Sequence, residues 1–183
     1  GFDGRLTSPN LHKALCEGLK DSGAKVINIG MGPTPMTYFA HFHLKADAVI
    51  MVTGSHNPSE YNGFKMVLNK HSFYAEDIQS LQKLIDQNNL KLTEGEIINQ
   101  DIKKEYINRL LQNINLNKKI KIAWDIGNGA MGAVIKEITS NLNNSDNILI
   151  NEEVDGNFPN HHPDPTVPKN MEQLVKVVKD KNC

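Results

Sequence analysis

The chain has 183 residues, with 20 Lys and Arg against 21 Asp and Glu, which gives a formal net charge of -1 at pH 7. This balance does not favour nucleic acid or acidic lipid as a partner, and no apolar run approaches the ~20 residues needed to span a bilayer. Hydrophobic residues make up 39% of the chain and charged residues 22%, as is ordinary for a soluble globular protein of one or two domains.

The cysteines and the chain ends indicate where such a protein works. Two cysteines, Cys16 and Cys183, are too few for a disulfide framework, so we expect a reducing cytoplasm. Cys16 shares a helical apolar stripe with leucines, and we expect it to be buried. The first five residues lack the charged and apolar segments of a signal peptide. Position 1 is Gly rather than Met and opens directly on a loop signature, so we expect a piece of a longer protein.

The first half of the chain alternates predicted helices and strands. Ser8-Pro9 begins a helix that ends near Ser22-Gly23, because a polar cap and a proline favour the first turn and glycine favours the end. Residues 26–29 form a strand, and Thr34-Pro35 begins a second helix that runs to about Leu44. Further along we expect strands at 48–52 and 63–68, a helix marked by Ile78, Leu81, Leu84 and Ile85, a polar loop at 88–100, and a helix from Ile102 to Ile114.

The second half begins after a polar break at residues 115–119, where we place a domain boundary, giving domains 1–116 and 117–183. The order there is a strand at 120–125, a loop at 127–132, a helix from 133 to about 142, a loop at 141–147 and a strand at 148–150. A proline-rich irregular segment at 152–168 leads into a last helix with Met171, Leu174, Val175 and Val178 inward. The alternation predicts an α/β fold with mainly parallel sheets and helices on both faces.

The stretch from Ala48 to Lys65 is the strongest candidate for a functional site. A buried strand at 48–52 ends in Thr53-Gly54-Ser55-His56-Asn57-Pro58, and ligands of open α/β sheets gather where strands end. If the strand at 63–68 pairs with it, the Lys65 ammonium lies beside the Ser55 hydroxyl. His56, Asn57 and Lys65 are groups that a phosphorylated serine needs around it. From composition alone, the segment is equally typical of a plain turn.

Three other features invite a functional interpretation. The turn from Gly127 to Gly132 matches Gly-x-Gly-x-x-Gly, and Glu152 follows Gly132 by 20 residues, as in dinucleotide-binding domains; a tight turn between strand and helix is the simpler interpretation. His161, His162 and Asp164 are residue types that bind zinc or iron, although a rigid interdomain loop explains them as well. Arg5 lies at the same sheet edge as Ser55 if the first strand is parallel, or it is a plain surface charge.

The motifs taken together resemble those of the α-D-phosphohexomutases, in particular the bacterial phosphomannomutase/phosphoglucomutase group. Thr53 to Pro58 followed by Tyr61-Asn62-Gly63-Phe64-Lys65 is similar to the family's phosphoserine loop. The rest of the chain follows the family order; in this family the Gly-x-Gly-x-x-Gly turn begins the second domain. The matching segments are Gly4-Arg5-Leu6, Ser8-Pro9, Gly32-Pro33-Thr34-Pro35, Asp125 to Gly129 and Val154 to Pro165.

The resemblance implies a phosphohexomutase that moves a phosphoryl group between C1 and C6 of a glucose or mannose phosphate. It implies that Ser55 carries the phosphate, that His56, Asn57 and Lys65 assist, and that Arg5 contacts the substrate. The Ser55 phosphate would hold Mg²⁺, the other metal ligands being absent from this chain. The chain would hold the first of four domains and the beginning of a second, similar α/β domain, so we expect no mutase activity without domains III and IV. Phe2 stands where the family often has Arg, so only Arg5 is carried over.

Overall fold

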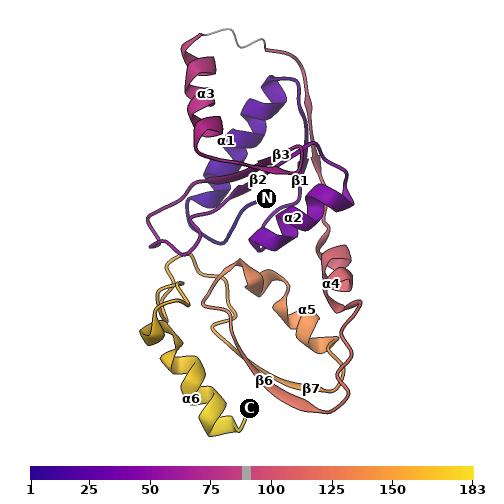
Figure 1. Ribbon diagram of the computed structural model, residues 1–183, viewed down its shortest axis with the longest axis vertical. Helices are drawn as coiled ribbons and strands as arrows, with labels where there is room; N and C mark the ends of the chain where they lie inside the picture. Colours follow the sequence, from indigo (N-terminus) through magenta and orange to yellow (C-terminus); the bar gives the residue numbers. More distant parts are fainter. Residues whose placement is uncertain (88–91) are drawn as a thin grey trace.

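Two α/β lobes follow each other along the long axis of the molecule, as Figure 1 shows for the computed structural model, which describes residues 1–87 and 92–183. The first lobe contains the N-terminus, and the second carries the C-terminal helix. The predicted α/β class is confirmed: both lobes combine helices with sheets that contain a parallel pair of strands, and the sheet of the first lobe is mixed.

The first lobe is built on a mixed sheet in two parts that Phe2 connects. Strands β1 (Lys25–Asn28) and β5 (Glu96–Asn99) pair in parallel. Strand β2 (Ala48–Val52) pairs antiparallel with β3 (Phe64–Leu68), which pairs with β4 (His71–Phe73). Phe2 forms parallel bridges to both Met31 and Val52, so the N-terminal segment lies between the two parts. The parallel direction brings the residues after Phe2 to the edge where β2 ends.

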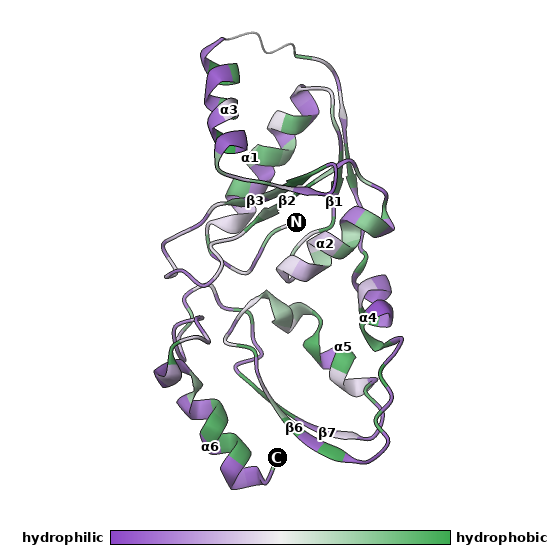
Figure 2. Cartoon of the chain, viewed as in Figure 1, coloured by the Kyte–Doolittle hydropathy of each residue, from purple (hydrophilic) through white to green (hydrophobic). Residues whose placement is uncertain are grey.

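Helices α1 (Ser8–Asp21) and α2 (Thr34–His43) both carry proline in their first turn, as the sequence predicts. Proline suits that place because its missing N–H would have no partner within the helix. Cys16 is buried in α1, as expected. Figure 2 shows hydrophobic sectors alternating with hydrophilic ones along α1 and α3 (Glu76–Asp86), whereas the strands of the first lobe are mainly hydrophobic.

One hydrophobic cluster joins the two lobes. Met36 and Ala40 of α2 pack in the same cluster as Ile107 of α4 (Lys103–Leu111) and Val134 and Ile138 of the second lobe. The core therefore continues across the polar segment 115–119. Because packed cores deform little, this cluster fixes the two lobes relative to each other.

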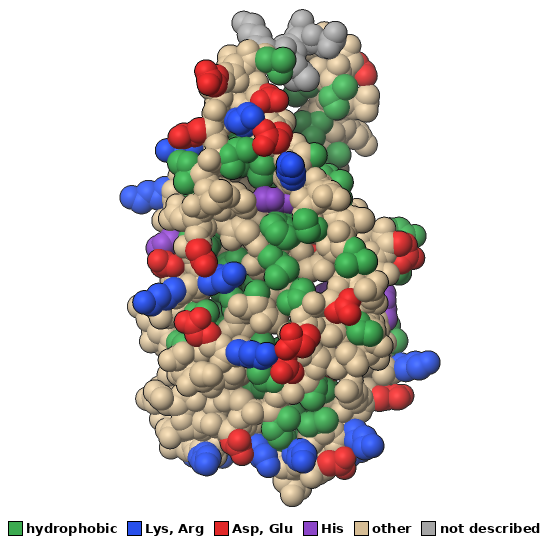
Figure 3. Space-filling view, turned by 180° about the vertical axis from the view of Figure 1, so that it is seen from behind, with side chains coloured by type: hydrophobic (Ala, Val, Ile, Leu, Met, Phe, Trp, Pro, Cys, Tyr) green, Lys and Arg blue, Asp and Glu red, His purple; other side chains and the backbone are tan. Residues whose placement is uncertain are grey.

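The second lobe has a parallel pair of strands, β6 (Ile120–Asp125) and β7 (Ser145–Ile150). A 3₁₀ turn, η1 (Ala130–Ala133), precedes α5 (Ile135–Ser140). The long segment after β7 is irregular, as predicted, and leads through η2 (Pro168–Met171) into α6 (Glu172–Lys181). The face seen from behind in Figure 3 carries acidic and basic side chains interspersed over both lobes.

Several predicted boundaries were wrong. The expected loop 88–100 contains β5, and its residues 88–91 lie outside the described residues. Strand β7 begins at Ser145, within the expected loop 141–147, and the helix expected from residue 133 begins at Ile135. Helix α4 ends at Leu111, before Ile114. Strand β4 was not predicted, because a strand of three residues, two of them exposed, shows little periodicity in the sequence.

Within the described part of the chain, the structure contains no helix with the length and apolar character needed to cross a membrane.

Candidate active site

The loop from Thr53 to Gly63 connects β2 to β3 and carries Ser55 at its exposed turn. Val52 is fully buried and Thr53 nearly so, which fixes the start of the loop in the sheet. The amide of Thr53 donates to the carbonyl of Gly63 at 2.9 Å and closes the base of the loop. Ser55 is exposed, so its hydroxyl is open to a ligand.

Ser55 has a backbone conformation that side chains rarely adopt. Its φ is 56°, in the left-handed region. Its amide donates to Thr53 Oγ1 at 2.9 Å, and the Asn57 amide donates to the Gly54 carbonyl at 3.1 Å. Strained residues of this kind persist only where the surroundings hold them, and they concentrate at functional sites.

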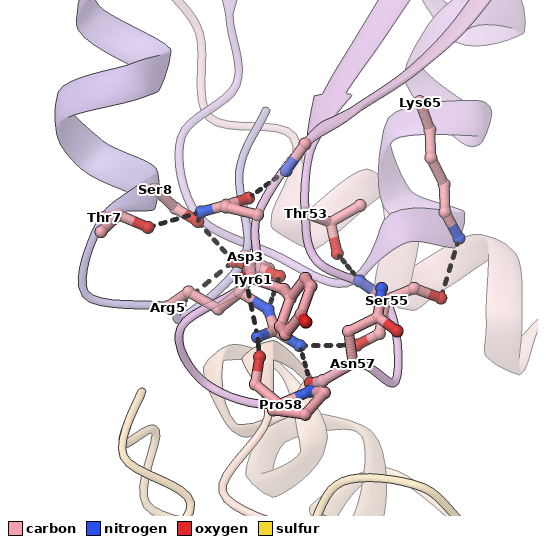
Figure 4. A network of polar contacts seen from close by, with 12 residues as sticks. Asp3, Arg5, Thr7, Ser8, Thr53, Ser55, Asn57, Pro58, Tyr61 and Lys65 are labelled. Atoms are coloured by element: carbon pink, nitrogen blue, oxygen red, sulfur yellow. Dashed lines mark hydrogen bonds and ion pairs between the residues drawn. The ribbon is translucent and has the colours of Figure 1, made fainter.

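Lys65 lies beside Ser55, as the sequence predicts. The antiparallel register pairs Lys65 with Met51, near the end of β2. From there its Nζ reaches the Ser55 hydroxyl oxygen at 3.3 Å (Figure 4). An ammonium at this position can offset negative charge on a group attached to Ser55 Oγ.

His56 and Asn57, the other two predicted catalytic residues, are exposed on the same turn. His56 lines the same cavity as Ser55 and Lys65. Asn57 offers its main-chain carbonyl to Arg5 Nη2 at 2.7 Å. In the ranges 1–87 and 92–183 neither side chain makes a hydrogen bond, so both are available to a ligand.

Arg5 lies at the predicted sheet edge, but its guanidinium holds the serine loop. The side chain is only 1% exposed. Its Nη1 donates to the carbonyls of Pro58 and Tyr61 at 2.6 and 3.0 Å. Its Nη2 donates to the carbonyls of Ser55 and Asn57 at 3.0 and 2.7 Å (Figure 4). Substrate contact by Arg5 stays a prediction, because all four of these N–H groups point at loop backbone.

Asp3 orients Arg5 and ties it to the first helix. One of its carboxylate oxygens, Oδ1, accepts from Ser8 Oγ at 2.6 Å and from the Arg5 amide at 3.1 Å. The other, Oδ2, lies 3.3 Å from Arg5 Nε, a buried guanidinium nitrogen that makes no hydrogen bond within the described part of the chain. Asn62 Nδ2 donates to Ser8 Oγ at 2.8 Å from the far end of the loop. Sequence reasoning missed Asp3 and Asn62, whose only signal is their place beside the two loop motifs.

A cavity of about 480 Å³ opens between the lobes and includes Ser55, His56 and Lys65 among its lining residues. The first lobe also contributes Asp3 and the segment 33–35. The second lobe contributes the turn around Gly127, together with Phe158 and His161. The hydroxyl and the ammonium therefore face a space that both lobes enclose.

The metal interpretation of the histidine segment was wrong for the described residues, which contain no group of three or more His, Cys, Asp or Glu that could hold a metal. His161 Nε2 lies 2.9 Å from Asp125 Oδ2, and its Nδ1 lies 3.0 Å from the carbonyl of His162. Asp164 bonds to the hydroxyl and amide of Thr166, and these bonds lower the pKa of its carboxyl. The segment is a hydrogen-bonded loop.

Close packing explains why the turn from Gly127 to Gly132 is rich in glycine. A Cβ at Gly132 would collide with the carbonyl oxygen of Glu152, so glycine lets the chain after β7 pass close to η1. The Glu152 carboxylate lies 3.8 Å from Lys136 Nζ. Tight packing explains the motif without a nucleotide, as the simpler interpretation predicts.

A layered α/β lobe with an exposed serine on a strand-end loop, facing a cavity shared with a second α/β lobe, places this chain among the α/β proteins whose ligands bind where strands end. Residues 1–91 match the family of phosphoglucomutase/phosphomannomutase, alpha/beta/alpha domain I, and residues 104–183 match its domain II. The chain belongs to the phosphoglucomutase/phosphomannomutase family.

Individual relatives agree with this assignment. A phosphomannomutase/phosphoglucomutase from Pseudomonas putida is 42% identical over 98% of this chain, and a phosphoglucomutase from Neisseria meningitidis is 41% identical over 98%. The chain spans 39% of the length of each. A crystal structure of a family protein from Burkholderia thailandensis matches 98% of this chain and 41% of its own, with a TM-score of 0.90 at 37% identity.

Proposed function

We propose that the chain is the part of a phosphohexomutase that carries its phosphoserine. The enzyme moves a phosphoryl group between C1 and C6 of a glucose or mannose phosphate. The observation that carries this proposal is the exposed Ser55 hydroxyl, 3.3 Å from Lys65 Nζ, in a cavity that both lobes line. The names of the relatives support the same chemistry.

The reaction takes two phosphoryl transfers. In the first, a free hydroxyl of the hexose monophosphate forms a bond to the phosphorus of phospho-Ser55, the bond from phosphorus to Ser55 Oγ breaks, and the hydroxyl proton is released as Oγ takes up a proton. The product is the 1,6-bisphosphate. After this intermediate turns over, Ser55 Oγ forms a bond to the phosphorus of the other phosphoryl group and loses its proton, the bond from that phosphorus to the sugar oxygen breaks, and the sugar oxygen takes up a proton as the isomeric monophosphate leaves. Such transfers have loose transition states, so positioning and charge stabilisation dominate.

The chain's own residues divide this work. Lys65 offsets the charge of the phosphoryl group on Ser55, because its Nζ already lies beside Oγ. His56 and Asn57 orient the substrate hydroxyl from the same turn. The loop is held by Arg5 at its backbone, so Ser55 presents Oγ in one place.

Mg²⁺ fits this site through an oxygen of the Ser55 phosphate, a hard donor of the kind it prefers. When bound, it would neutralise phosphoryl charge. Within residues 1–87 and 92–183 no cluster of three ligand side chains accompanies Ser55. We therefore assign the remaining ligands to the rest of the full-length polypeptide. In this proposal, domains III and IV of the same polypeptide complete the site. Residues 1–116 form domain I, and residues 117–183 form part of domain II. The enzyme is cytoplasmic.

Replacing Ser55 by Ala in the full-length protein tests the proposal. We expect mutase turnover to be abolished, because no oxygen is left to carry the phosphoryl group. Ser59→Ala is the matched control: it removes an exposed hydroxyl from the same loop, whose only partner among the described residues is Glu60, and is expected to keep activity. Normal turnover by Ser55→Ala would refute the assignment. Intact mass and phosphopeptide mapping add a second readout, because a non-catalytic sugar-phosphate-binding module would carry Ser55 unmodified.

A further inference from the structure

A segment of the second lobe packs directly on the residues that hold the serine loop. A Cβ at Gly156 would lie 2.7 Å from the Leu6 amide and 2.8 Å from the Gly4 carbonyl. A Cβ at Gly4 would collide with the Val154 side chain. Two glycines thus permit backbone contact between the segment 153–160 and the loop that carries Arg5.

Phe158 extends this contact to the guanidinium itself. The Arg5 Cζ lies 5.2 Å from the centre of the Phe158 ring, within the range of a cation–π interaction. Phe158 has a φ of 50°, a conformation that is rare for a bulky residue and persists only where the surroundings impose it. Its amide donates to the Asp155 carbonyl at 3.0 Å. The ring is therefore held against Arg5 by the fold of its own segment.

Asn128, in the glycine-rich turn, holds the segment 153–160 in place through hydrogen bonds. It is 4% exposed and makes four hydrogen bonds with residues of the chain after β7. Its backbone bonds to Asn151 and Asp155 at 2.8 and 3.0 Å. Its side chain bonds to the Glu153 carbonyl at 2.9 Å and to Asn160 Nδ2 at 2.8 Å.

The contacts connect Asn128 to Phe158 through the backbone of Asp155, Phe158 to Arg5, and Arg5 to four carbonyls of the serine loop. We propose that Phe158, fixed by Asn128, is a positioning residue for Ser55 that acts through the Arg5 guanidinium. The second lobe thereby sets the geometry of a nucleophile that belongs to the first. This inference rests on the proposed function for its kinetic consequence, but not for its structural one.

Arg5 is suited to pass this positioning on. It is a planar fork with fixed donor directions, so tilting its plane displaces all of its carbonyl partners together. The guanidinium also packs tightly against the backbone of Gly54, where an added Cβ would lie 2.5 Å from Arg5 Cζ. With the ring of Phe158 removed, the guanidinium gains space and a solvent path, and the loop loses its single conformation.

The test uses the full-length protein with Phe158→Ala, Phe158→Tyr and the control Phe42→Ala, which removes an exposed ring from α2. We expect Phe158→Ala to lower kcat about tenfold, a loss between those of an exposed and of a desolvated cation–π contact, with little change in KM. Amide hydrogen exchange of residues 54–57 is expected to speed up by a similar factor. Phe158→Tyr keeps the ring and Phe42→Ala lies elsewhere, so both are expected to match the parent protein.

A double-mutant cycle with Arg5→Lys decides whether Phe158 acts through Arg5. Lysine has no planar fork to orient, so Phe158→Ala is expected to add little to Arg5→Lys. Full additivity, or unchanged exchange of residues 54–57 in Phe158→Ala, would overturn the inference. Asn128→Gly, which tolerates the φ of 57° at that position, is expected to reproduce the faster exchange. If the parent protein shows no mutase activity, the proposed function fails, whereas the exchange measurement still tests the positioning.

Discussion

Ser55 and Lys65 are ten residues apart in the chain, and the strand register alone brings them together. Pairing of Met51 with Lys65 places the lysine one position inside the mouth of the hairpin, from where its long side chain reaches Oγ. This pair was predictable, because in a β-hairpin the connecting loop sets the register and therefore which residues of the two strands lie opposite each other. The role of Arg5 was not, because a buried arginine with four carbonyl partners leaves no pattern in the sequence.

Lys65→Met in the full-length enzyme is expected to lower kcat by ~10²–10³-fold, the usual loss for one group that stabilises charge in the transition state. Methionine keeps most of the chain length and removes the ammonium. Steady-state kinetics measure the effect, and Lys13→Met, at an exposed position on α1, is the matched control. A kcat within about twofold of the parent would show that Lys65 does not stabilise the transferred phosphoryl group.

At the scale of elements, strands with strong apolar runs were predictable and weak edge strands were not. Strand β2 has five apolar residues in sequence, whereas β5 offers only Ile97 and Ile98 between polar neighbours. What makes β5 a strand is its parallel pairing with β1, some seventy residues away, helped by the bond from Asn28 Nδ2 to Asn99 Oδ1 at 2.7 Å. Pairings at that separation depend on the whole fold and cannot be read from a local window.

The serine loop as an element depends on the absence of a side chain at Gly54. Gly54→Ala is expected to destabilise the protein by about 1–3 kcal/mol, because the added Cβ would meet both Arg5 and the Tyr61 carbonyl in a packed site. It is also expected to lower activity by displacing the loop. The midpoint of urea denaturation of the full-length protein measures the first effect.

Gly18→Ala is the control for that measurement. The position lies within α1, and beyond its chain neighbours and the helix backbone no atom of the described residues lies within 4 Å of an added Cβ. Alanine there is expected to stabilise the helix by about 0.5–1 kcal/mol. A Gly54→Ala protein as stable as the Gly18→Ala protein would show that the loop tolerates a side chain beside Arg5.

At the scale of the whole molecule, the two lobes share a hydrophobic cluster, and both line the cavity. The cluster shared by α2, α4 and α5 fixes the lobes, and the segment 153–160 contacts the first loop directly. The sequence predicted both lobes and the irregular segment but not the contact between them. Asp125 and His161 were each singled out by motifs, yet only the fold shows that they pair across 36 positions.

Under the proposed function, the 183-residue chain by itself is expected to show no mutase turnover, since it spans 39% of the length of its relatives and we assign further metal and sugar ligands to domains III and IV. A coupled assay on the purified chain, with glucose 1-phosphate or mannose 1-phosphate and Mg²⁺, measures this. The full-length protein serves as the positive control. Measurable turnover by the short chain would contradict the proposed division of the site among domains.

Arg5 donates its hydrogen bonds to main-chain carbonyl oxygens of the serine loop, and every amino acid has such an oxygen. Substitutions at positions 58 and 61 are therefore expected to keep the hydrogen bonds of Arg5, since the guanidinium binds the main-chain carbonyls of those residues and not their side chains. Tyr61 already turns more than half of its surface to solvent. Side chains at the rim of the loop can accordingly be exchanged while the hydrogen bonds that hold Ser55 in place stay the same.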